Sequence, residues 1–86
     1  DTLRVMGSKP KVLIIRMKHV NYLDGTGAST LANLIKDCKA KKTKVILSAV
    51  QNQPAKLLER AGVKSDGVSL SIAIDYDEAL EIAKRL

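Results

Sequence analysis

Short apolar runs alternate with segments of helical periodicity along the chain, and this alternation restricts the possible folds more than any other feature. The runs are rich in valine, isoleucine and leucine and lie at residues 11–17, 43–49 and 68–74. Apolar residues recur at helical spacing in the segments 28–38, 54–61 and 75–86. Strands that alternate with helices favour crossover connections and parallel pairing. We therefore expect an α/β fold with a small, mainly parallel sheet and alternating helices.

Turn residues place several boundaries of these elements. Residues 1–6 have the character of the last turns of a helix, and Gly7 to Pro10 would end that helix with a turn. Pro54 suits the first turn of a helix, and Gly62 suits the position just after its end. The predicted order is therefore helix, strand, helix, strand, helix, strand, helix.

The last helix carries its own start signal. Asp75 precedes it and Glu78 follows three residues later, which is the spacing of a capping box. We expect this helix to run to Leu86, with Ala79 and Ala83 on its apolar face.

Composition bounds the size and the chemistry. The chain has 86 residues, which we interpret as one domain over residues 1–86. It begins at Asp1 rather than at a methionine, so we expect a fragment of a longer chain. Three strands make a small sheet, so we expect that one or two further N-terminal strands are lacking. Two tyrosines are its only aromatic residues, so the core must be aliphatic. The single cysteine, Cys38, excludes an internal disulfide, and we expect it to be a small core residue.

The net charge of +6 indicates either a solvated, lysine-rich surface or an acidic partner. The lysines crowd one region and form a candidate basic patch of Lys36, Lys39, Lys41, Lys42 and Lys44. An anionic membrane surface or an acidic protein would suit this patch. Nucleic acid is not expected, because base stacking needs aromatic side chains and no nucleic-acid-binding motif occurs.

The stretch Asp24-Gly25-Thr26-Gly27 lies between an apolar run and a helical segment. Asp24 or Thr26 can cap the helix, and the two glycines permit unusual backbone angles. An exposed helix start would favour an anion or a partner's carboxylate, through its N–H groups and its dipole. We therefore take these four residues as the candidate partner- or anion-binding loop.

The residues in and around this loop do not support a dinucleotide-binding, Walker A or catalytic function. The glycines match the first two of a dinucleotide-binding fingerprint, but Thr30 stands where the third would be, and no acid ends the next strand. A Walker A loop is excluded because no Gly-Lys-Ser/Thr sequence occurs. His19, Asp24 and Thr26 lie within eight residues, yet closeness in sequence provides neither a base in reach nor an oxyanion hole. We expect no catalytic residue, no metal and no cofactor, because no cluster of ligands is visible.

The stretch "VLIIRMKHVNYLDGTGASTLANLIK" resembles the STAS domain, which bacterial anti-sigma factor antagonists share with the cytoplasmic tails of SulP-type sulfate and anion transporters. Asp24, Thr26 and Gly27 match the pattern Asp-x-[Ser/Thr]-Gly of that family. The stretches "KVILSAVQNQPAKLLERAGV" and "SIAIDYDEALEIAKRL" are similar to later parts of the transporter tails. The resemblance covers nearly the whole chain, and together with the run from Gln51 to Pro54 it indicates the transporter branch.

The resemblance implies a regulatory domain that docks partners and is not an enzyme. In SulP-type transporters such a domain lies under the membrane domain, at the cytoplasmic face of the membrane. The implied partners are the membrane domain of the same transporter, regulatory proteins and, for some family members, a nucleotide. The implied binding surface is centred on Asp24 to Gly27 and on the helix that follows.

One departure from the family pattern separates its branches. In the antagonist branch, a partner kinase phosphorylates the Ser or Thr directly after the aspartate, and Gly25 stands at that position here. The neighbouring Thr26 is then the candidate for modification, although it matches the following position of the pattern. Two alternatives stay open: a stand-alone switch of the anti-sigma factor antagonist type, and a nucleotide-binding regulatory module.

Overall fold

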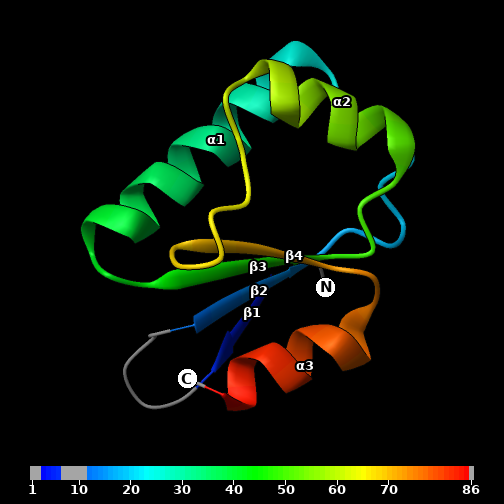
Figure 1. Cartoon of the computed structure of the whole chain (residues 1–86). Coiled ribbons are helices and arrows are strands. Elements are labelled where there is room, and N and C mark those ends of the chain that lie inside the picture. Colours follow the sequence, from blue (N-terminus) through cyan, green and yellow to red (C-terminus); the bar gives the residue numbers. More distant parts are fainter. Residues whose placement is uncertain (1–2, 7–11, 86) are drawn as a thin grey trace.

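Four strands form one sheet in the computed structural model, which describes residues 3–6 and 12–85 (Figure 1). They are β1 (Leu3–Met6), β2 (Val12–Arg16), β3 (Lys44–Ser48) and β4 (Leu70–Ala73), and they lie side by side in that order. The strands β2, β3 and β4 are parallel, whereas β1 pairs antiparallel with β2. The predicted α/β fold with a mainly parallel sheet is confirmed.

Three helices cover the two faces of this sheet. They are α1 (Gly25–Ala40), α2 (Asn52–Arg60) and α3 (Tyr76–Lys84). Figure 1 shows α1 and α2 on one face and α3 on the other. The predicted run of the last helix to Leu86 is wrong, because α3 ends at Lys84 and the backbone N–H of Arg85 bonds to the carbonyl of Ile82 at 3.2 Å. Such a bond to the third residue back tightens the final turn.

Residues 3–6 form a strand, so the helix predicted for residues 1–6 is wrong over these four residues. β1 pairs with β2 from Leu3 opposite Ile15 to Met6 opposite Val12. Six residues are too few to show helical periodicity, and the unpaired backbone groups along an edge of β2 favour pairing with a neighbouring segment. The turn predicted for residues 7–10 lies outside the described residues. That 1–86 is one domain of a longer chain, with strands before Asp1, stays a prediction.

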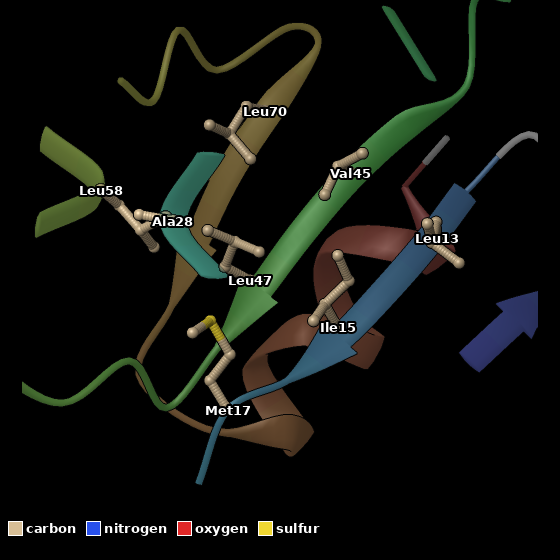
Figure 2. Close-up of a cluster of buried hydrophobic side chains, with 8 residues drawn as sticks. All are labelled: Leu13, Ile15, Met17, Ala28, Val45, Leu47, Leu58 and Leu70. Atoms are coloured by element: carbon tan, nitrogen blue, oxygen red, sulfur yellow. The ribbon is translucent and has the colours of Figure 1, made fainter. Parts of the chain in front are cut away.

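Eight buried apolar residues fill the space between the sheet and the helices α1 and α2 (Figure 2). They are Leu13, Ile15, Met17, Ala28, Val45, Leu47, Leu58 and Leu70. Their strand members alternate along each strand, because successive strand side chains point to opposite faces. Cys38 packs against this cluster as expected, and burial raises the pKa of its thiol.

A second, smaller cluster lies between the sheet and α3. Its buried members are Val12, Ile14, Ile46, Ala73 and Ala79. Because β2 and β3 bury side chains on both faces, their sequences are continuous apolar runs rather than alternating ones. The predicted aliphatic core is confirmed for these two clusters.

The caps of the last two helices follow the sequence signals. The backbone N–H of Glu78 donates to Asp75 Oδ1 at 2.8 Å, and Glu78 Oε1 accepts from the N–H of Ile74 at 2.9 Å. The predicted spacing of the capping box is thereby confirmed, although Glu78 bonds to the N–H of Ile74, the residue before the cap, and not to that of Asp75. Pro54 is buried in the first turn of α2, and Gly62, with φ +88°, follows the end of that helix.

The loop between α2 and β4 is organised around Asp66. Its Oδ1 accepts from the backbone N–H groups of Val68, Ser69 and Leu70 at 2.8, 2.7 and 3.0 Å. Its Oδ2 accepts from the Ser69 hydroxyl at 2.6 Å. This hydroxyl and the N–H groups hold the pKa of Asp66 far below its ordinary value. Because Asp66 occupies the N–H groups of Val68 and Ser69, β4 begins at Leu70 and not at Val68 as predicted.

Replacing Asp66 with alanine should lower the Tm, with a pH dependence that follows from the shifted pKa. The folded-state pKa lies below the ordinary value of 3.8, so the stabilisation is present above that value and is lost as the pH falls toward the folded value. We expect the difference in Tm between wild type and Asp66→Ala to be largest near neutral pH and to shrink below about pH 4. Thermal unfolding followed by circular dichroism measures this, and a difference independent of pH would contradict it.

Candidate functional site

The residues Asp24 to Gly27 lie where the chain passes from the carboxyl end of β2 into α1. Residues 17–24 form the connection, and the next residue, Gly25, is the first of the helix. The carboxyl ends of parallel strands meet at one edge of a sheet, and ligands of open α/β sheets bind outside that edge. The candidate loop therefore occupies a favourable place in this fold.

Asp24, and not Thr26, is the cap of α1. Asp24 Oδ1 accepts from the backbone N–H of Gly27 at 2.7 Å, and the Asp24 carbonyl accepts from the N–H of Ala28 at 2.9 Å. The side chains of Asp24 and Thr26 and the whole of Gly25 are exposed. Thr26 takes part through its carbonyl, which accepts from the Thr30 hydroxyl at 2.9 Å. The helix start is thus both exposed and held in place.

Gly25 and Gly27 differ in the space that surrounds them, and neither has a left-handed backbone conformation. Glycine permits unusual backbone angles, but in the described residues the glycines with a left-handed φ are Gly62 and Gly67, and not Gly25 or Gly27. A Cβ on Gly27 would lie 3.0 Å from Leu23 Cδ1 and 3.1 Å from Asp24 Oδ1, whereas nothing lies within 4 Å of a Cβ on Gly25. Gly27 therefore permits the close approach of the capping residue, and Gly25 borders open space.

Two glutamines at the start of α2 fix the connection from the other side. The Gln53 side chain accepts from the Leu23 N–H at 2.7 Å and donates to the Leu23 carbonyl at 2.9 Å, as a neighbouring strand would. Gln51 Nε2 donates to the carbonyl of Lys18 at 2.7 Å. The contacts of Gln51 and Gln53 were not predicted from the sequence, where the two glutamines served only as part of the family resemblance. The residue type was a usable signal, because the primary amide of a glutamine can donate one hydrogen bond and accept another at the same time.

Replacing Gln53 with alanine should destabilise the chain by about 1–3 kcal/mol, because two hydrogen bonds to the half-buried backbone of Leu23 are lost. Gln51→Ala is the matched variant, and it should cost about 1 kcal/mol or less because it removes one exposed hydrogen bond. Urea denaturation measures both. Equal effects of the two substitutions would show that Gln53 does not hold the loop as described.

The basic patch lies at the other end of α1. This helix has 16 residues, which span about 24 Å. Lys36 and Lys39 are on its later turns, and Lys41 and Lys42 follow its end. Lys44 Nζ donates to the carbonyl of Gly67 at 3.3 Å. Lys39, Lys42 and Lys44 line one pocket, and Lys36 lines a neighbouring pocket that also contains Lys39. None of these residues belongs to the stretch from Asp24 to Gly27.

The described residues contain no hydrogen bond that joins His19 to Asp24 or Thr26. The Asp24 carboxylate is engaged in capping and does not orient a base. A search of residues 3–6 and 12–85 finds no group of three or more histidine, cysteine or acidic side chains that could hold a metal ion. The helices in the same described ranges include none that is long and apolar enough to span a bilayer.

Comparisons with known proteins agree with the resemblance in the sequence. A family model described as the STAS domain matches residues 2–79. A putative sulfate transporter, YvdB of Bacillus subtilis (strain 168), is 34% identical over 55 residues. That alignment covers 64% of this chain and 10% of the length of YvdB, so the chain spans a small part of that relative. The comparison with solved structures finds no match.

Proposed function

Because this chain belongs to the STAS domain family, we propose that it is the cytoplasmic regulatory domain of a SulP-type sulfate or anion transporter. In this proposal it docks partners and does not catalyse a reaction. The similarity to YvdB, a putative sulfate transporter, supports the transporter branch over the stand-alone switch. The membrane domain of the same transporter is the first expected partner, and a regulatory protein is the second.

The observation that carries the proposal is the ordered, exposed start of α1. Asp24 caps this helix start, because its Oδ1 accepts a hydrogen bond from the Gly27 N–H at 2.7 Å. Gln53 fixes the preceding residue, Leu23, from α2. A surface that is already ordered loses little conformational entropy when a partner binds, so more of the contact energy remains as affinity.

The charge at the start of α1 indicates which groups of a partner it suits. The first turn of α1 contains no acidic residue, whereas the first turn of α3 contains Asp77 and Glu78. A helix dipole favours negative charge at its N-terminus. Both helices have an aspartate cap, but beyond Asp24 the first turn of α1 adds no negative charge. The start of α1 is therefore better suited than that of α3 to receive a carboxylate or another anion from a partner.

The basic patch gives the domain a second expected contact. We propose that Lys36, Lys39, Lys41, Lys42 and Lys44 face the anionic inner leaflet beneath the membrane domain. Each lysine near such a surface contributes about 1 kcal/mol of attraction. Since the patch and the candidate loop lie at opposite ends of α1, the two contacts can be made at the same time.

Site-specific cross-linking in the intact transporter tests the docking proposal. Gly25→Cys, in a Cys38→Ser background and labelled with a photoactivatable group, should cross-link to the membrane domain or to one regulatory protein. Gly25 suits this purpose because a side chain there meets open space. Glu81→Cys, on the exposed side of α3, is the matched control and should give no such product. Identical products from both positions would contradict docking at the start of α1.

The alternatives predict different results for the same loop. Efficient phosphorylation of Thr26 by a partner kinase would support the stand-alone switch. Amide shifts confined to Gly25 to Ala28 during a GTP or ATP titration would support the nucleotide-binding module. The lack of a hydroxyl at Gly25 supports the transporter proposal against the switch.

A further inference from the structure

A cavity of about 380 Å³ lies between α1 and the loop that joins α2 to β4. Figure 1 shows this loop, in yellow, running from α2 to the sheet beside α1. Ala32 and Ile35 line the cavity from α1, and the loop residues Gly62 and Val63 line it from the other side. None of its lining residues belongs to the candidate loop at the start of α1, whereas Lys36 and Lys39 are shared with the basic patch.

Three lysines from two different walls line this cavity. Lys36 and Lys39 are three residues apart and so lie on the same side of α1, and Lys64 comes from the opposite wall. Across residues 3–6 and 12–85, no ion pair or hydrogen bond engages any of the three side chains. Like charges around one cavity repel one another, so an anion placed between them would lower the electrostatic energy.

Asp66 is the one carboxylate among the described lining residues. Its two oxygens accept four hydrogen bonds from Val68, Ser69 and Leu70, so its charge is already stabilised within its own loop. With three lysines and one aspartate, the lining carries a net charge of +2. The cavity is therefore electropositive even with the aspartate included.

The loop wall that carries Lys64 is fixed on both sides. Before Lys64, the N–H of Gly62 donates to the carbonyl of Glu59 at 3.0 Å, and the N–H of Val63 donates to that of Leu58 at 2.9 Å. After it, the N–H of Asp66 donates to the carbonyl of Leu70 at 3.1 Å. Both walls of the cavity are thus held by hydrogen bonds, which lets the lysines act together on one ligand.

We propose that this cavity binds a phosphoryl-bearing anion, with Lys36, Lys39 and Lys64 as its ligands. Lysine binds phosphate as a point charge, and three ammonium groups suit an anion with more than one charge and several acceptor oxygens. A cavity of this size falls within the range of about 300–1,000 Å³ that small-molecule sites occupy. No aromatic side chain appears among the described lining residues, so the phosphoryl group, and not a stacked base, is the recognised part.

Titration of the 86-residue chain with pyrophosphate, followed by backbone amide shifts, tests the proposal. We expect saturable shifts at Lys36, Lys39 and Gly62 to Ser69, while the amides of Gly25 to Gly27 serve as an internal reference. Lys36→Gln/Lys39→Gln/Lys64→Gln should weaken binding at least about tenfold, because three charge-assisted contacts are lost. Lys18→Gln/Lys56→Gln/Lys84→Gln removes the same charge from exposed positions outside both the cavity and the basic patch, and it should change the affinity much less. Circular dichroism checks that both variants fold.

Vesicle sedimentation separates the two sources of such an anion. If phosphatidylcholine vesicles containing phosphatidic acid sediment the chain, and the cavity variant alone fails to sediment, the ligand is a lipid headgroup. If pyrophosphate binds but these vesicles do not sediment the chain, the ligand is a soluble phosphorylated molecule. Equal losses in the two lysine variants, or no saturable shift at the cavity amides, would overturn the proposal. Neither result bears on docking at the start of α1.

Discussion

Replacing Leu47 with alanine is expected to lower the free energy of unfolding by about 2–5 kcal/mol. Leu47 is 0% exposed and lies on β3, between the neighbouring strands β2 and β4. Its side chain belongs to the cluster under α1 and α2 (Figure 2), where a truncation leaves a cavity. Small domains have total stabilities of about 5–15 kcal/mol, so this one change should remove a large share. Urea denaturation followed by circular dichroism measures it.

Ile72→Ala is the matched control for Leu47→Ala. Ile72 lies opposite Leu47 in the register of β3 and β4, but it is 49% exposed on the edge strand. Because half of its surface is already in contact with water, truncation should cost about 1 kcal/mol or less. Similar losses at the two positions would contradict the description of β4 as the open edge of the sheet.

Replacing Gly27 with valine should destabilise the chain by about 1–2 kcal/mol through loss of the α1 cap. The new Cβ would lie 3.1 Å from Asp24 Oδ1, which accepts the capping hydrogen bond, and 3.0 Å from Leu23 Cδ1. Leu23 packs against the core and cannot move away without losing contacts there. We expect the amide signals of residues 23–28 to shift more than those of the sheet. Urea denaturation and amide spectra measure the two effects.

Gly25→Ala separates the cap from helix propensity. A Cβ on Gly25 meets nothing within 4 Å, and alanine is favoured over glycine in a helix by up to about 1 kcal/mol. This variant should therefore be as stable as wild type or slightly more stable. A loss at Gly25→Ala as large as that at Gly27→Val would mean that the two glycines have the same role, against the geometry of the cap.

The sequence predicted the parallel part of the fold well because local and long-range signals agree there. The central strand was expected at 43–49 and is Lys44–Ser48, since a run of β-branched and aliphatic residues suits burial on both faces. The acids expected to start helices do so: Asp24 caps α1 and Asp75 caps α3. In both cases a short polar side chain satisfies N–H groups three residues ahead, which is a purely local interaction.

Features that depend on distant partners were not predictable in the same way. β1 exists through pairing with β2, and its six-residue neighbourhood gave no periodicity to reveal it. Gln53 contacts Leu23 across 30 positions of sequence, so only the folded sheet shows that the two are neighbours. The late start of β4 has a local cause that the apolar pattern did not reveal, because the Asp66 side chain takes donors two and three residues ahead that a strand would have used. The candidate loop and the basic patch were both identified by residue type, but their separation along α1 required the structure.

Anion uptake by the transporter proposed above, carrying Thr26→Glu, tests the central claim most directly. Thr26 is exposed in the first turn of α1, and its contribution to the fold is a backbone carbonyl that the substitution keeps. A carboxylate suits the N-terminus of a helix, so folding and the amount of transporter in the membrane should stay unchanged. Its negative charge should repel the anionic group of a partner that docks at this surface. Lys84→Gln, exposed on α3, changes the net charge by the same amount and should leave uptake unchanged. We expect a several-fold fall in uptake for Thr26→Glu alone; uptake equal to that of wild type at equal surface amounts would contradict the proposal.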